Sequence, residues 1–206
     1  MRRIGHRGAM GHAPENTMAS FQKALELGCD EVETDVWLTQ DGRLLVTHDR
    51  PTERSSLSLD EVLDFCRGRM AVNVEMKCEK DETRARETGA AVGARLAARG
   101  RGDFYVSSFW WSALEGARSA APAVRRAFLL SDSPDRVALL ASAKALGLWA
   151  LHPERQYVTP ELIKAAHSAS LRVHTWTVND PKEIATFRNW SVDGIMSDFP
   201  ERVPKE

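Results

Sequence analysis

The stretch from Arg2 to Gly28 reads RRIGHRGAMGHAPENTMASFQKALELG and joins a short apolar run, a polar loop and an amphipathic pattern. The first residues predict a strand, and the pattern from Thr17 onward predicts a helix. Asn16 or Thr17 would cap the start of that helix, and Gly28 would end it. A strand that leads through a loop into a helix is half of a βαβ unit, so its recurrence would indicate a parallel sheet.

The same order recurs along the whole chain. The predicted strands are Met1–Gly5, Glu31–Leu38 with a continuation at Leu44–Asp49, Met70–Met76, Asp103–Phe109, Val124–Leu130, Leu148–His152, Leu171–Val178 and Val192–Asp198. The predicted helices that follow them include Asp81–Arg99, Trp111–Ala120, Ser133–Gly147, Thr159–Ala169 and Asp180–Arg188. About eight strands that alternate with helices favour a closed (β/α)8 TIM barrel over a doubly wound sheet. We expect one compact domain over residues 1–206, with only a stub of a last helix after Phe199.

Composition limits the classes of partner. The 206 residues carry a net charge of −1, which provides no overall field for nucleic acid or a membrane surface. The cysteines Cys29, Cys66 and Cys78 are odd in number and widely spaced, so we expect small buried side chains rather than disulfides or a zinc site. No signal-peptide core or membrane-length apolar run is evident, which predicts a cytoplasmic location without stable membrane insertion.

Carboxylates follow the predicted strands at the end where a barrel of this kind carries its active site. Glu33 and Asp35 are two residues apart, so both point to one face of a strand at positions about 7 Å apart. Glu75 occupies the corresponding part of the next parallel strand. A Glu-x-Asp pattern can also occur on a surface strand, where both charges are solvated. In a parallel barrel, however, the strands are covered on both faces. Three buried carboxylates need a cation, and all-oxygen ligation favours Mg²⁺ or Ca²⁺.

Two histidines and two cations lie at the same predicted edge. The histidines are His6 and His48, and histidine is the side chain that can donate or accept a proton near neutrality. Arg7 and Lys77 are side chains suited to phosphate oxygens. Together with a metal ion, these groups predict a site for a phosphoester, with electrostatic stabilisation as the main catalytic contribution.

The remaining histidines and tryptophans are assigned more simply. Structural roles are expected for His12, His167 and His174, whereas the sequence leaves His152 undecided. Trp176 is expected to line the pocket. Trp110 and Trp111 are compatible with either the core or the pocket, and Asp49 with either orienting a neighbour or opening a turn.

These residues together resemble the glycerophosphodiester phosphodiesterases, which are metal-dependent TIM-barrel enzymes of the same broad group as phosphatidylinositol-specific phospholipase C. The matching motifs are HRG (His6–Gly8), PENT (Pro14–Thr17), ETD (Glu33–Asp35), HD (His48–Asp49), VEMK (Val74–Lys77), SSF (Ser107–Phe109), WTVND (Trp176–Asp180) and DGIMSDFP (Asp193–Pro200). They occur in order over nearly the whole chain. The resemblance implies a single-domain barrel that cleaves a glycerophosphodiester into a phosphomonoester, such as glycerol 3-phosphate, and an alcohol.

The resemblance also implies roles for single residues. They are His6 and His48 as catalytic acid and base, Glu33, Asp35 and Glu75 as ligands of Mg²⁺ or Ca²⁺, Arg7 and Lys77 as phosphate contacts, and Trp176 as an aromatic wall beside the alcohol. The nucleophile is either water or a neighbouring hydroxyl of the substrate. The sequence does not distinguish which histidine acts first, and it gives no oligomeric state.

One segment departs from the family pattern. Glycerol-specific members carry a small insertion after the HD motif, and here only Arg50–Leu57 precedes the predicted helix SLDEVLDF. A more open mouth is therefore expected, with room for bulkier head groups. The alternatives are a phospholipase-D-like hydrolase of lysophospholipids, a barrel that binds a phosphate ligand without turnover, and a metal-dependent isomerase or lyase acting at carbon.

Overall fold

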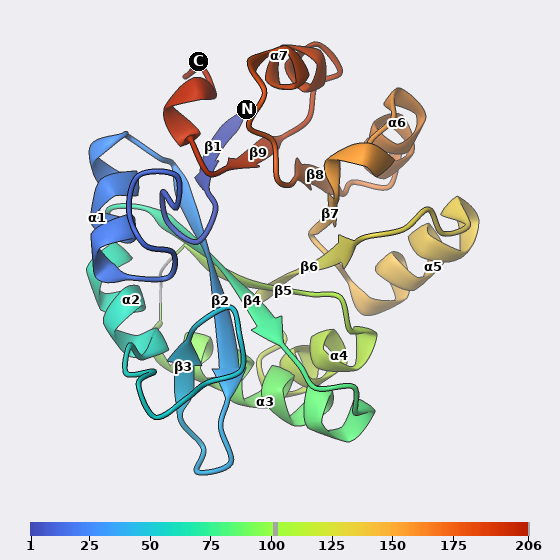
Figure 1. Cartoon of the computed structure of the whole chain (residues 1–206). Helices are drawn as coiled ribbons and strands as arrows, with labels where there is room; N and C mark the ends of the chain where they lie inside the picture. The colour runs from blue at the N-terminus through green and yellow to red at the C-terminus, as the bar shows by residue number, and fades with distance from the viewer. Residues whose placement is uncertain (101–102, 206) are drawn as a thin grey trace.

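The computed structural model describes residues 1–100 and 103–205, and within them the strands form one closed barrel (Figure 1). The strands are β1 (Arg2–Gly5), β2 (Glu31–Leu38), β3 (Leu44–Val46), β4 (Ala71–Lys77), β5 (Phe104–Ser108), β6 (Arg125–Leu130), β7 (Ala150–Pro153), β8 (Arg172–Thr175) and β9 (Gly194–Ser197). Their order in the sheet is β1-β9-β8-β7-β6-β5-β4-β2-β3, and a further pairing of β1 with β2 closes the ring. The predicted TIM barrel is thus confirmed.

The strand β3 differs from the others because it runs antiparallel to β2. Only Leu44–Val46 of the predicted continuation Leu44–Asp49 is extended in the sheet. Val46 pairs with Val36, and the amide of Thr47 then donates to the carbonyl of Asp35. This hairpin pairs β3 with the C-terminal part of β2, and so it brings His48 back to the barrel mouth.

Helices cover the outside of the barrel, as Figure 1 shows. They are α1 (Met18–Glu26), α2 (Leu59–Cys66), α3 (Glu82–Ala98), α4 (Trp111–Ala120), α5 (Arg136–Leu146), α6 (Pro160–Ser168) and α7 (Pro181–Asn189), with short 3₁₀ turns at Arg155–Tyr157 and Pro200–Arg202. The last turn is the predicted stub. Thr17, not Asn16, is the N-cap of α1, and its side chain accepts from the amide of Ser20. The residue after the C-cap of that helix is Gly28, whose φ of 71° favours glycine.

The strands alternate between an apolar outer face and a polar inner face. Val32 and Val36 of β2 belong to the hydrophobic core that packs under the helices. The residues that alternate with them, Glu31, Glu33 and Asp35, are buried and face the barrel interior. The sequence alternation therefore places carboxylates inside the barrel, where they need partners or a cation.

Two further sequence expectations concern the cysteines and the absence of a membrane-spanning segment. The cysteines are free thiols, and Cys29 and Cys66 are buried while Cys78 is half-buried. Burial raises the pKa of each to about 12, so they behave as small apolar side chains. In the described part of the chain, none of the helices has the length and apolarity needed to span a bilayer.

Candidate active site

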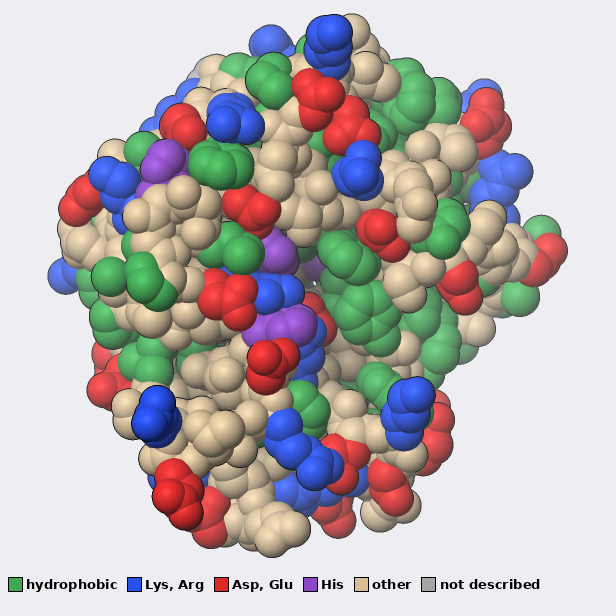
Figure 2. Space-filling model, viewed as in Figure 1, with side chains coloured by type: hydrophobic (Ala, Val, Ile, Leu, Met, Phe, Trp, Pro, Cys, Tyr) green, Lys and Arg blue, Asp and Glu red, His purple; other side chains and the backbone are tan. Residues whose placement is uncertain are grey.

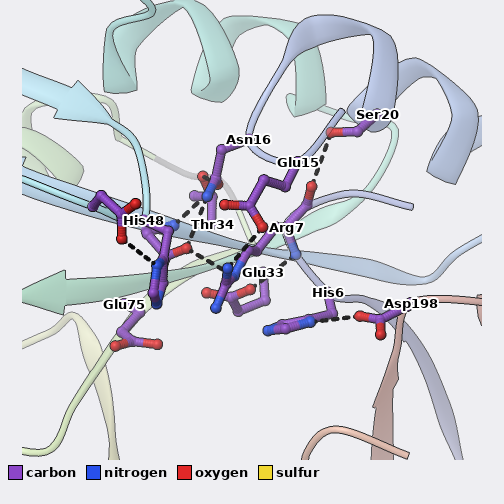
Figure 3. Close-up of polar contacts among 12 residues, drawn as sticks. His6, Arg7, Glu15, Asn16, Ser20, Glu33, Thr34, His48, Glu75 and Asp198 are labelled. Atoms are coloured by element: carbon purple, nitrogen blue, oxygen red, sulfur yellow. Dashed lines mark hydrogen bonds and ion pairs between the residues drawn. The ribbon is translucent and has the colours of Figure 1, made fainter. Parts of the chain in front are cut away.

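The carboxylates of Glu33, Asp35 and Glu75 lie close together toward the end of the barrel where β2 and β4 finish. Figure 3 shows Glu33 and Glu75 with the polar side chains around them. Asp35 is paired in register with Glu75 across the two parallel strands. One oxygen of each of the three side chains lies within 4.8 Å of the others. The structure therefore brings together the three predicted metal ligands.

Within this cluster, Glu33 is short of hydrogen-bond donors. Glu33 is 3% exposed, and its Oε1 is buried without a hydrogen-bond partner, while its Oε2 accepts from the amide of Arg7 at 3.0 Å. Burial, together with the charges of Asp35 and Glu75, raises the pKa of Glu33 well above its ordinary value. Burial and Asp35 also raise the pKa of Glu75. An oxygen-lined site with an unpartnered carboxylate atom fits a hard divalent cation.

The two predicted phosphate contacts lie against these carboxylates. Nζ of Lys77 is 2.6 Å from Oε1 of Glu75 and 3.0 Å from Oδ1 of Asp35. Nε of Arg7 is 3.2 Å from Oδ2 of Asp35, and its Nη1 donates to Glu15 at 2.7 Å. Burial lowers the pKa of Lys77, but its two carboxylate neighbours outweigh that effect and keep it cationic. Both cations are therefore positioned at the edge of the acidic cluster.

His6 follows β1 and is oriented by residues that the sequence interpretation missed. Its Nδ1 is 2.7 Å from Oδ1 of Asp198, which follows β9. Oδ2 of Asp198 accepts from the side-chain amide of Asn179 at 2.6 Å, and Oδ1 of Asn179 accepts from the hydroxyl of Ser197 and the amide of Asp198. Burial by itself would raise the pKa of Asp198. The hydrogen bonds from His6 and Asn179 outweigh that effect, so the pKa is lowered and the side chain stays ionised.

Asp198 lies in the DGIMSDFP motif at the end of a predicted strand, and this position was the one sign in the sequence that it belongs to the site. Nothing in the spacing alone connects it with a histidine 192 residues earlier, which only the closure of β1 against β9 brings within reach. The carboxylate accepts from Nδ1 of His6 and so leaves Nε2 of that ring for proton exchange.

His48 is reached from the opposite side, after β3. Its Nδ1 is 3.0 Å from Oδ1 of Asp49, and its backbone carbonyl accepts from Nε1 of Trp37 at 3.1 Å. In the view of Figure 3, His6 and His48 lie on either side of Glu33. Asp49 thus lies within hydrogen-bond distance of His48, and the two histidines lie on opposite sides of Glu33 in this view.

The PENT motif contributes more than a helix cap. Asn16 is buried, and its Nδ2 donates to Oδ2 of Asp35 at 2.8 Å while its Oδ1 accepts from the hydroxyl of Thr34. Asn16 and Arg7 both have positive φ, at 54° and 48°, which is uncommon for residues with a β-carbon. Backbone of this kind is concentrated at functional sites. Asn16 therefore orients a predicted metal ligand, a role that the sequence interpretation did not assign.

An aromatic pair borders the mouth on another side. Trp176 packs edge-on against Phe109, with ring centroids 5.7 Å apart, and its Nε1 donates to the carbonyl of His152 at 2.7 Å. Trp111 instead stacks on Phe128, and Trp110 precedes α4 as its N-cap. Figure 2 shows hydrophobic side chains to the right of the histidines at the centre of this face. The predicted wall residue Trp176 is therefore half-buried beside another aromatic side chain.

The other histidines have structural contacts outside the acidic cluster. His12 pairs with Glu201, and His167 pairs with Asp193. His174 is fully buried and stacks against His152, with ring centroids 5.1 Å apart. Burial lowers the pKa of His152 to about 3 and holds that of His174 well below its ordinary value, so both are neutral core side chains.

Comparison with known proteins agrees with this geometry. Residues 6–67 and 57–202 match the model of the glycerophosphoryl diester phosphodiesterase family. The chain belongs to this family. That assignment confirms the expected family, the barrel fold and the class of phosphoric diester hydrolases.

Individual family relatives extend over almost the whole chain. An uncharacterised protein of Bacillus subtilis, YqiK, is 30% identical and covers 97% of this chain and 95% of its own length. A glycerophosphodiester phosphodiesterase of Bacillus altitudinis is 29% identical, with 98% of this chain and 96% of that protein covered. A solved phosphodiesterase of Oleispira antarctica, in complex with the product sn-glycerol-3-phosphate, has a TM-score of 0.86 at 26% identity, covering 97% and 94% of the two chains.

Proposed function

We propose that this protein hydrolyses glycerophosphodiesters to a phosphomonoester, such as glycerol 3-phosphate, and an alcohol, and that the reaction depends on Mg²⁺ or Ca²⁺. The observation that carries the proposal is the cluster of Glu33, Asp35 and Glu75 flanked by two oriented histidines. The family assignment and the product bound to the Oleispira antarctica phosphodiesterase support the same substrate class.

Glu33, Asp35 and Glu75 would hold the divalent ion, because they offer three carboxylates to one point and Oε1 of Glu33 has no other partner. Such an ion, when bound, neutralises negative charge on phosphoryl oxygens. Asn16 keeps Asp35 in place through its side-chain amide. The protein would thus supply a preformed anionic cradle that binds hard cations in preference to zinc.

The histidines would exchange protons through Nε2. Each ring has Nδ1 directed at a carboxylate, Asp198 for His6 and Asp49 for His48. One ring would take the proton of the nucleophile, and the other would donate a proton to the leaving alkoxide. Their placement on opposite sides of Glu33 would allow an attack on one side of phosphorus and departure on the other.

Arg7 and Lys77 would bind the remaining phosphoryl oxygens. Both are held at the edge of the cluster by carboxylates, so their ammonium and guanidinium groups are already oriented before substrate enters. Trp176 and Phe109 would contact the alcohol part of the substrate. The half-buried aromatic pair provides apolar area, which leaves lysophospholipids as a second substrate class to be tested.

The test is hydrolysis of glycerophosphocholine, glycerophosphoethanolamine and a lysophosphatidylcholine in Mg²⁺, Ca²⁺ or EDTA. We expect turnover with a divalent ion and none in EDTA. His48→Ala should lower kcat by about 10²–10⁴-fold, the usual contribution of a general acid or base. His167→Ala is the matched control, since that histidine pairs with Asp193 outside the cluster. Equal activity of the two variants, or full activity in EDTA, would contradict the proposal.

A further inference from the structure

A cavity of about 920 Å³ lies at the opposite end of the barrel from the carboxylate cluster. Its lining comes from positions at or just before strand starts: Arg2 opens β1, Asp30 precedes β2 and Asp193 precedes β9. The proposed catalytic groups instead follow strand ends. None of the residues proposed for catalysis lines this cavity, so it is a separate feature of the molecule.

The lining is dominated by positive charge. The basic side chains that line it come from different parts of the chain and are Arg2, Arg69, Arg172, Arg188 and Lys205. The acidic lining consists of Asp30 and Asp193 within the described residues. Because the whole chain carries a net charge of −1, this concentration of cations is local and is not a consequence of composition.

The two carboxylates are already engaged by other groups. Oδ2 of Asp30 accepts from the backbone amide of Arg3 at 2.8 Å. Asp193 accepts from Nε2 of His167 at 2.8 Å through Oδ2 and from Nη1 of Arg172 at 3.2 Å through Oδ1. Asp193 thus pairs with Arg172, and within the described residues neither carboxylate forms an ion pair with Arg69, Arg188 or Lys205.

Three of the five cations have no carboxylate partner in the part of the chain that the structure describes. They are Arg69, Arg188 and Lys205, and each is exposed. The guanidinium of Arg69 lies over the ring of Phe65, 5.1 Å from its centroid. Nζ of Lys205 lies 2.5 Å from the position that a β-carbon on Gly28 would take, so the ammonium rests against the cavity wall. Like charges around one cavity repel each other, and a bound anion would relieve that repulsion.

We propose that this cavity is a second anion site, which binds a small molecule carrying two or more phosphate groups. Its volume lies near the upper end of small-molecule sites, about 300–1,000 Å³, and so exceeds what one phosphate group requires. The unpartnered cations stand on separate walls, from the loop before β4, the end of α7 and the C-terminal segment. Spaced phosphate groups match spaced cations, and guanidinium groups bind phosphate through paired N–H donors.

The test is isothermal titration of the whole protein with pyrophosphate in EDTA, which prevents binding through a divalent ion at the carboxylate cluster. We expect one pyrophosphate per chain. Arg188→Ala combined with Lys205→Ala should weaken binding at least tenfold without changing hydrolase activity. Lys182→Ala is the matched control because it removes an exposed cation of α7 that does not line the cavity, and its affinity should stay within twofold of the wild type.

Amide chemical shifts locate the bound pyrophosphate. We expect the largest shifts at Gly28 and Ser191, which line the cavity, rather than at Gly8 and Gly11 near the mouth. Circular dichroism checks that the double variant is folded. Absence of binding at millimolar pyrophosphate, equal affinity of the double variant and the wild type, or shifts confined to Gly8 and Gly11 would each overturn the proposal.

Discussion

Glu31 and Glu33 are two residues apart on β2, face the same interior and are both buried, yet their surroundings differ. Glu31 accepts from the hydroxyl of Tyr105 and from Nη1 of Arg2 at 3.0 Å. Glu33 has one backbone donor and two other carboxylates as neighbours. Burial raises the pKa of Glu31 to about 7 even though Tyr105 and Arg2 oppose the shift. Burial of a carboxylate is therefore no sign of a metal site by itself, whereas a buried carboxylate that lacks donors and lies beside two others is.

The largest effect on stability should come from removing Glu31, the carboxylate whose hydrogen-bond partners are in place. Glu31→Ala leaves Arg2 and Tyr105 without their shared partner inside the barrel. We expect the free energy of unfolding to fall by about 1–3 kcal/mol, the usual cost of a buried polar group left without its partner, because Arg2 is 35% exposed and keeps Asp103. Urea denaturation at pH 7 measures it. The folded fraction should keep its metal affinity, and a loss of metal binding equal to that of Glu33→Ala would contradict the distinction.

Asp198→Asn tests the orientation of His6. The amide is a weaker acceptor for Nδ1 and can present a donor to it, so the ring loses its fixed orientation. We expect kcat/KM to fall by about 10–100-fold, as for other residues that orient a functional side chain. The pH profile of kcat should also shift. Glu201→Gln is the control, because it changes a histidine–carboxylate pair with His12 away from the cluster. Equal losses in both variants would indicate a structural effect.

The buried histidine His152, which lies in the barrel interior, should make stability depend on pH. Burial lowers the pKa of His152 from its ordinary value of 6.5 to about 3 in the folded chain, so the unfolded chain takes up the proton first. Stability from this group is present above pH 6.5 and is lost as the pH falls toward 3. Glu31, with its raised pKa, contributes in the opposite direction between pH 4.5 and 7.

The difference between wild type and His152→Phe isolates the histidine from Glu31. Between pH 7 and 5.5 the wild type should lose about 1 kcal/mol more stability than the variant, from the linkage of one lowered pKa. Urea denaturation at the two pH values measures this difference. Identical pH dependence in both proteins would show that His152 is not neutral in the folded chain.

The sequence predicts the barrel because its strands and helices alternate with clear periods. It also predicts the cluster of Glu33, Asp35 and Glu75, since residues two apart on a strand share a face and parallel neighbours finish at one edge. It did not predict the pairing of His6 with Asp198 or of Asn16 with Asp35. Those contacts depend on barrel closure and on a loop with positive φ, which local patterns do not encode.

Local pattern also misplaced the end of two strands. Leu171–Val178 forms a strand only from Arg172 to Thr175, and Trp176 then makes one isolated parallel bridge with Glu154 before the chain leaves the sheet. The polar continuation to Asp49 leaves the sheet after Val46. In both places the chain departs from the regular ladder to bring a side chain of the mouth into position.

The central claim is that the carboxylates at the barrel mouth are arranged to bind a divalent ion. The most direct test is thermal unfolding of the wild type and of Glu33→Gln, each measured with and without Mg²⁺ or Ca²⁺. In EDTA the variant should be more stable by about 0.5–1 kcal/mol, because one like-charge repulsion is removed. The metal should stabilise the wild type and have little effect on the variant. A variant that is less stable in EDTA, together with a wild type that does not respond to either ion, would contradict the account.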